Sequence, residues 1–105
     1  MADFMKILQQ AQEMQTKLQQ VQEELAQRTV TASSGGGIVS VEADGQGGIR
    51  SIKIDRSIVN ATDVEMLEDL VLVAVTEAQK KAREVAQAEM GKLTGGLNLP
   101  FKLPF

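Results

Sequence analysis

The chain has 105 residues, a net charge of −3, and no Cys, His, Trp or Tyr. This length is sufficient for one domain. The missing side chains exclude disulfides, thiolate or imidazole metal sites, and catalysis that depends on His or Cys. The acidic total argues against strong electrostatic attraction to nucleic acid, although it still permits a local basic face.

The N-terminal sequence has neither a basic segment nor a long apolar one. No apolar run approaches the roughly 18 residues that a membrane-spanning helix needs. We therefore expect a cytoplasmic protein without a membrane partner.

Apolar residues recur near the N-terminus at alternating spacings of three and four. They are Phe4, Ile7, Ala11, Met14, Leu18, Val21 and Leu25. This pattern predicts an amphipathic helix over residues 3–27 with a narrow apolar seam. The seam fits either the rest of its own domain or a second helix, and its regularity favours a helix as the neighbour.

Three short segments rich in β-forming residues follow. They span residues 29–32, 38–43 and 49–54. Gly-rich turns separate them, and their apolar residues alternate with polar ones. The side chains expected to point inward are Val39, Val41, Ala43, Ile52 and Ile54. These features predict a three-stranded antiparallel sheet that has one covered face and one open face.

A second helix is predicted over residues 63–90. Thr62 and Glu65 form a capping box at its start, and Gly91 is a plausible stop. Residues 70–75 are apolar on every side of this helix, so a single sheet cannot cover them, and a second copy of the chain is the economical cover. The candidate dimer-interface residues are Leu70, Val71, Val73, Ala74 and Ala78.

These elements predict an α+β protomer in the order α-β-β-β-α, with the sheet between two long helices. It forms a single domain over residues 1–92. Residues 93–105 combine Gly and Pro with large apolar residues. This tail is either disordered or lies in a groove of the dimer, and the sequence leaves both possibilities open.

No segment has the pattern of a catalytic or cofactor site. Gly91-Lys92-Leu93-Thr94 departs from a phosphate-binding loop because Leu93 separates the Lys from the Thr, and Ala86 occupies the position of the upstream Gly. The Gly-rich turn at 44–48 joins two strands, so it is not a dinucleotide-binding loop. We expect no enzyme activity, no metal and no small-molecule substrate.

Several segments, taken in order, are specific enough to compare with known families. They are Met5-Lys6, Ala11-Gln12-Glu13-Met14-Gln15, Gln22-Glu23-Glu24-Leu25, Gly36-Gly37-Ile38-Val39, Ile52-Lys53-Ile54-Asp55, Glu65-Met66-Leu67-Glu68-Asp69-Leu70-Val71, Met90-Gly91-Lys92-Leu93-Thr94-Gly95-Gly96-Leu97 and Leu103-Pro104-Phe105. This set resembles the YbaB/EbfC family of bacterial nucleoid-associated proteins. The chain departs from many members in lacking a Gly-rich start and in having a shortened tail.

The resemblance implies a tweezer-shaped homodimer that binds double-stranded DNA in the nucleoid, without a cofactor. It also implies a role in chromosome organisation, gene regulation or DNA repair.

If the chain binds DNA, the basic residues of the helices and of the third strand are the candidate contacts. They are Lys6, Lys17, Arg28, Arg50, Lys53, Arg56, Lys80, Lys81 and Arg83. Each is otherwise an ordinary solvated charge, and Arg50 or Arg56 could instead cover apolar surface beside Ile52 and Ile54. The rival hypothesis is a protein-interaction or scaffold module that uses the apolar tail and the helix predicted over residues 3–27, whose apolar seam has a heptad spacing.

Overall fold

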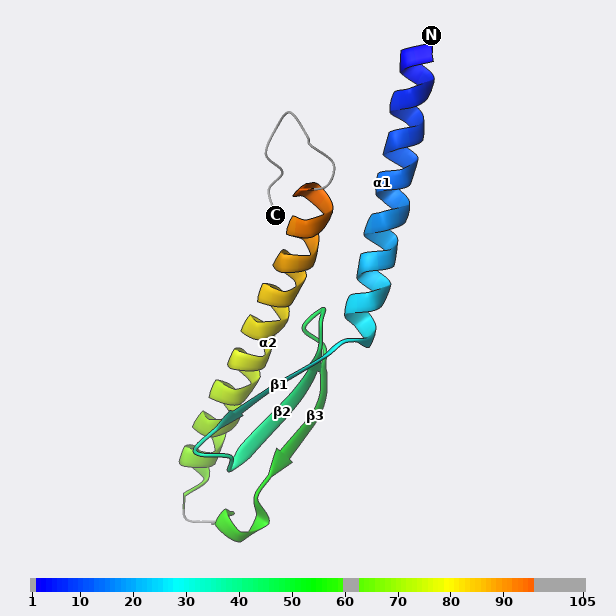
Figure 1. The fold of residues 1–105 in the computed structure, drawn as a ribbon. Coiled ribbons are helices and arrows are strands. Elements are labelled where there is room, and N and C mark those ends of the chain that lie inside the picture. The colour runs from blue at the N-terminus through cyan, green and yellow to red at the C-terminus, as the bar shows by residue number, and fades with distance from the viewer. Residues whose placement is uncertain (1, 60–62, 96–105) are drawn as a thin grey trace.

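The structure of the chain is a computed structural model that describes residues 2–59 and 63–95. Within these ranges the elements are α1 (Ala2–Gln27), β1 (Thr29–Ser34), β2 (Val39–Asp44), β3 (Ile49–Ile54), a short 3-10 helix η1 (Arg56–Ile58) and α2 (Val64–Gly95). The strands form one antiparallel sheet in the order β1-β2-β3. Figure 1 shows α2 lying along the sheet while α1 extends beyond it. The predicted α-β-β-β-α fold is confirmed.

The apolar seam of α1 changes its environment along the helix. Leu25 is buried, and the preceding seam residues are half-buried: Met14, Leu18 and Val21. Phe4 and Ile7, in contrast, are 63% and 61% exposed. The C-terminal part of the seam therefore packs on its own protomer, where α1 contacts α2 and β2. The N-terminal part is left open to solvent in this protomer.

Two Gly-rich turns join the strands. Gly35, Gly36 and Gly37 all have positive φ, a backbone conformation that Gly adopts readily. This tight turn lets β1 continue to Ser34, beyond the predicted 29–32, and β2 spans Val39–Asp44 instead of 38–43. β3 has its predicted bounds.

The pairing of β2 with β3 contains one irregularity. Val41 lies opposite Ile52 and Glu42 lies opposite Ser51, but Ala43 lies opposite Ile49. The residue between Ile49 and Ser51 is therefore the extra residue of a β-bulge. A bulge turns the side chain of its extra residue to a new direction, and here that residue is Arg50.

α2 begins at Val64 and ends at Gly95, later than the predicted end at residue 90. Asp63 Oδ1 accepts a hydrogen bond of 3.4 Å from the backbone N of Met66. The predicted cap, Thr62, lies outside the described residues. The predicted stop at Gly91 was wrong: this residue lies inside the helix and does not have positive φ. A Gly in a helical conformation costs only about 1 kcal/mol relative to Ala, which the flanking turns can offset.

Small side chains form the core between α2 and the sheet. Ala74 and Ala78 of α2 are fully buried and pack with Val39, Val41 and Ala43 of β2. A ridge of Ala residues lets a helix approach its neighbour closely. Among the described residues, the largest side chains that are fully buried are those of Val39 and Val41, so this core contains no large fully buried side chain.

α2 packs on β1 and β2 and leaves β3 largely uncovered. Ile52 was predicted to point inward. It does lie on the same sheet face as Val41, yet it is 44% exposed because no helix of its own protomer covers it. Ile54 is half-buried. The residues of the predicted tail beyond Gly95 lie outside the described residues, so neither expectation for the tail is tested.

Candidate nucleic-acid interface

Lys6 and Lys17 stand on the same flank of α1. They are eleven residues apart, which is close to three helical turns and about 16 Å along the axis. Both are exposed, and neither side chain pairs with another described residue. Glu13 lies between them on that flank and reduces the local positive potential. α1 therefore offers two free cations with an acidic residue between them.

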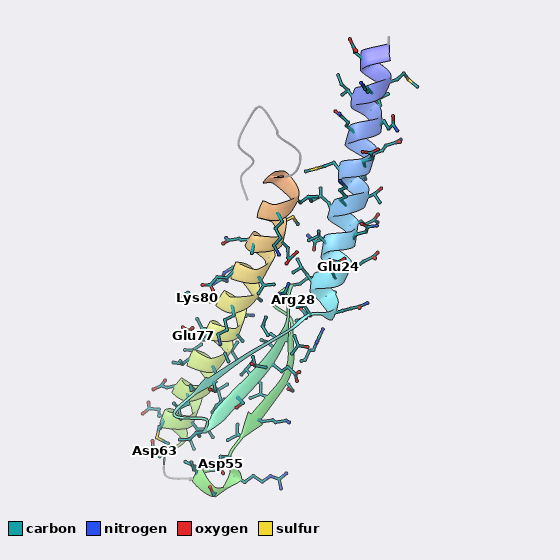
Figure 2. The ribbon with its side chains drawn as sticks, viewed as in Figure 1. Glu24, Arg28, Asp55, Asp63, Glu77 and Lys80 are labelled. Carbon is teal, nitrogen blue, oxygen red and sulfur yellow. The ribbon has the colours of Figure 1, made fainter. Side chains whose placement is uncertain are left out.

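Arg28 lies where α1 joins the sheet (Figure 2), and an acidic residue of α2 holds it there. Its Nη1 lies 3.1 Å from Glu89 Oε1, and Lys92 Nζ lies 3.5 Å from the same oxygen. The hydrogen bond from Arg28, followed by the charge of Lys92, lowers the pKa of the Glu89 carboxyl. These cations line a groove of about 450 Å³ that also includes Lys81. Lys92 is not among the DNA-contact candidates predicted from the sequence, because no local pattern links it to Arg28.

The open face of the sheet brings together two more candidates. A shallow hollow of about 460 Å³ is lined by Lys53 of β3 and Lys81 of α2. Four hydroxyl side chains line it as well: Thr31, Ser33, Ser40 and Ser51. Lys81 Nζ reaches the strand edge and donates a 2.9 Å hydrogen bond to the carbonyl oxygen of Thr31. Glu42 also lines the hollow, so its net charge is only weakly positive.

Arg50 does not project freely from β3. Its Nη1 donates to Thr29 Oγ1 at 2.9 Å, and its Nη2 donates to the carbonyl oxygen of Ala26 at 2.5 Å. The guanidinium therefore caps the C-terminal end of α1.

The remaining candidates are exposed and lie on separate elements. Lys80 and Arg83 project from the side of α2 opposite to the buried Ala74 and Ala78, and Figure 2 shows Lys80 beside Glu77. Arg56 begins η1 at the other end of the molecule. None of these three cations pairs with another described residue. The nine candidates thus do not form one patch, and three of them are already engaged: Arg28, Arg50 and Lys81.

The dimer-interface candidates separate into buried and exposed residues. Ala74 and Ala78 are fully buried in the core of their own protomer, so their side chains have no surface left for a partner. Leu70 and Val71 are half-buried against that core, whereas Val73 is 50% exposed. Val71 also lines an apolar groove of about 440 Å³ together with Leu72, Val75 and Ile54. The sequence missed this groove, because it depends on β3 being left uncovered.

The described residues contain no cluster of three or more Asp or Glu side chains that could hold a metal ion. Gly91 and Lys92 are part of a continuous helix and do not form a phosphate-binding loop. Neither helix, as far as it is described, is long and apolar enough to cross a membrane.

Comparison with known proteins gives a consistent assignment. The model of the YbaB/EbfC DNA-binding family matches residues 1–97. A nucleoid-associated protein of Gemmatimonas aurantiaca is 53% identical over 103 residues, which cover 98% of this chain and 99% of that protein. A nucleoid-associated protein of Thermodesulfovibrio yellowstonii is 57% identical over 97 residues, which cover 92% of this chain and 85% of that protein.

One solved structure is similar in fold. The crystal structure of an uncharacterized protein from Helicobacter pylori matches with a TM-score of 0.78 at 24% identity, and covers 87% of this chain and 96% of that chain. This likeness shows the fold alone. The family model and the sequence relatives together show that the chain belongs to the YbaB/EbfC DNA-binding family.

Proposed function

We propose that the protein is a nucleoid-associated protein that binds double-stranded DNA as a homodimer and acts in chromosome organisation, gene regulation or DNA repair. The observation that carries this proposal is the 53% identity to a nucleoid-associated protein over 98% of the chain. The exposed apolar side chains of β3 and α2 and the unpaired cations support it. The proposal places the protein in the nucleoid and requires no cofactor.

The dimer surface we propose is formed by the uncovered face of β3 and the adjacent side of α2. Ile49 and Ile52 of β3 are 38% and 44% exposed, and Leu72 of α2 is 65% exposed. The apolar groove lies between these elements. Exposed apolar side chains beside an apolar groove are typical of an interface. A second copy would complete a core whose own side chains are mostly Ala and Val.

The test of the dimer introduces one charge on this surface. Ile52→Asp should weaken self-association about tenfold or more, since removing a central interface side chain commonly costs over 1 kcal/mol. Ser33→Asp is the control, because it adds the same charge to an exposed residue of the open sheet face. Sedimentation velocity over a dilution series measures both. Unchanged association of Ile52→Asp would reject this interface.

The free cations provide the proposed DNA contacts. Among the described residues these are Lys6, Lys17, Lys53, Lys80, Arg56 and Arg83. They are dispersed among acidic residues, and the net charge is −3. Binding should therefore be of modest affinity and steeply dependent on salt. A homodimer doubles each group and thereby engages two stretches of the duplex.

A DNA titration by fluorescence anisotropy at several salt concentrations tests this function. The slope of log K against log salt should be about −2 to −4, corresponding to a few neutralised phosphates. Two double variants show which helix makes the contacts, because they change the net charge equally. One is Lys6→Glu with Lys17→Glu on α1, and the other is Lys80→Glu with Arg83→Glu on α2. No binding near 50 mM salt, or a flat slope, would refute DNA binding.

A protein-interaction module is the second candidate, and one observation favours it. The first turns of α1 expose Phe4, Met5, Ile7 and Leu8, which are 63%, 67%, 61% and 46% accessible. These side chains could bind a helix of another protein. The prediction of this candidate is a protein partner that remains bound to the purified chain after nuclease treatment. Loss of every partner on nuclease treatment would instead favour the DNA-binding function.

A further inference from the structure

The junction between α1 and the sheet consists of a single residue. α1 ends at Gln27 and β1 begins at Thr29, so only Arg28 separates them. A connection this short does not by itself fix the direction of a helix that extends beyond the sheet (Figure 1). The direction must come from contacts that the end of α1 makes with other elements.

The turn between β2 and β3 supplies the first of these contacts. The backbone N of Gly45 donates a 2.7 Å hydrogen bond to the carbonyl oxygen of Leu25. Gln46 Nε2 donates to the carbonyl oxygen of Gln22 at 3.0 Å and to its Oε1 at 3.1 Å. The approach is so close that a Cβ on Gly45 would lie 2.6 Å from the Leu25 carbonyl oxygen. The turn and the helix end therefore fit each other only with Gly at this position.

Arg50 supplies the second contact. The last turn of α1 has no basic residue of its own, and its final carbonyl groups lack partners within the helix. Arg50 donates to the Ala26 carbonyl oxygen and also to Thr29 Oγ1 at the start of β1. It therefore links the last turn of the helix to the first residue of the strand. The β-bulge opposite Glu42 and Ala43 makes Arg50 the extra residue on β3. Its side chain can therefore point toward the end of α1.

We propose that the turn Asp44–Gly48 and Arg50 form a clasp that sets the direction of α1 relative to the sheet, and that Arg50 is therefore a positioning residue for DNA binding and not a phosphate contact. The clasp itself follows from the geometry of the protomer, whereas its consequence for DNA rests on the proposed function. By fixing α1, the clasp fixes where Lys6 and Lys17 stand relative to the rest of the dimer.

The test measures the direction of α1 in the absence of DNA. The chain has no Cys, so Gln10→Cys on α1 and Gln87→Cys on α2 give two unique spin-label sites, both exposed. Labelled chain diluted with unlabelled chain reports the distance within one protomer by double electron–electron resonance. Gly45→Ala and Arg50→Lys should broaden or shift this distance. Arg50→Lys keeps the charge but cannot reproduce the two-branched guanidinium contact.

Arg56→Lys is the matched control, because it is the same chemical change at a side chain without a partner among the described residues. It should leave the distance distribution unchanged. Unaltered distributions in both Gly45→Ala and Arg50→Lys, with native circular dichroism, would overturn the clasp.

A DNA titration of Arg50→Gln separates positioning from contact. A positioning role predicts weaker binding with an unchanged slope of log K against log salt, together with an altered label distance. A phosphate contact predicts a slope smaller by about one and an unaltered distance, which would overturn the assignment. Failure of the unsubstituted chain to bind DNA would refute the proposed function, while the label distances would still decide the clasp.

Discussion

Val41 and Ile52 lie directly opposite each other on the same face of β2 and β3, yet Val41 is 1% exposed and Ile52 is 44% exposed. The difference arises because α2 packs on β1 and β2 and leaves β3 largely uncovered. Two neighbouring side chains of similar character therefore have separate roles. One belongs to the core of the protomer, and the other belongs to the proposed dimer surface.

Val41→Ala and Ile52→Ala should therefore differ in how their loss of stability depends on protein concentration. Val41→Ala should lower the free energy of unfolding by about 2 kcal/mol at every protein concentration, because it removes buried methyl groups and leaves a cavity. Ile52→Ala should act mainly by weakening association, so its effect should increase on dilution. Urea unfolding followed by circular dichroism at two protein concentrations measures both. Equal, concentration-independent losses would contradict this division.

The stability of the turn at 44–48 should depend on pH through Asp44. Its carboxylate accepts hydrogen bonds from the backbone N of Gly48 and of Gln46, and these bonds lower its pKa below the usual 3.8. A carboxyl whose pKa is lowered by folding stabilises the fold above its unfolded pKa, and this stabilisation is lost as the pH falls through the lower folded value. Asp44→Asn should therefore be less stable than the parent at neutral pH.

The difference between Asp44→Asn and the parent should shrink below pH 3.8. The comparison with the variant is needed because the pKa values of Asp55 and Glu89 are lowered as well and add to the acid sensitivity of the parent. Thermal unfolding across the acid range gives the measurement. A gap that stays constant with pH would show that the titration of Asp44 does not contribute.

Two glycines with open space around them should respond oppositely to replacement by Ala. Apart from the adjacent residues and the local helix backbone, no atom lies within 4 Å of a Cβ built on Gly36 or on Gly91. Gly91 lies within α2, so Gly91→Ala should stabilise the protein by up to about 1 kcal/mol. Gly36 has a φ of 70°, so Gly36→Ala should destabilise it by about 1 kcal/mol. Thermal unfolding of the two variants checks the signs, and a shared sign would contradict the backbone argument.

Glu89→Gln should strengthen DNA binding at low salt, because it releases Arg28 and Lys92 from the carboxylate they share. Glu84→Gln is the control, since it makes the same change in net charge in the same groove at a residue without an ion pair. The gain should be several-fold larger for Glu89→Gln and should vanish at high salt. Anisotropy titrations at two salt concentrations measure it. Equal gains in DNA affinity for the two variants would mean that only the net charge of the protein matters and that the groove lined by Arg28 and Lys92 does not contact DNA.

The order and type of the elements could be predicted from the sequence because each has a strong local signal. The heptad seam indicates α1, the alternation around Val41 indicates β2, and Gly-rich turns separate the strands. The ends of the helices and strands were harder to predict. Gly is a residue type that often ends a helix, but Gly91 does not have the positive φ that such an end requires.

The sites were harder to predict, because they depend on which elements are neighbours. Nothing local to Arg50 reveals that a bulge directs it to the end of α1, and nothing local to Arg28 reveals Glu89. The Ala ridge of α2 illustrates the same limit. Ala74 and Ala78 were candidates for the dimer interface, but their side chains pack on the sheet of the same protomer.

Because a single residue, Arg28, joins α1 to the sheet, a small change in the angle of α1 at this junction moves the N-terminal end of the helix by a large distance. The helix has 26 residues and is therefore about 39 Å long, so a rotation of about 10° at the base moves its first turn by about 7 Å. That displacement is roughly twice the 3.4 Å rise between successive phosphates of one DNA strand. Under the proposed function, an angular tolerance of a few degrees at Gly45 and Arg50 therefore decides whether Lys6, near the start of α1, meets the duplex backbone in register.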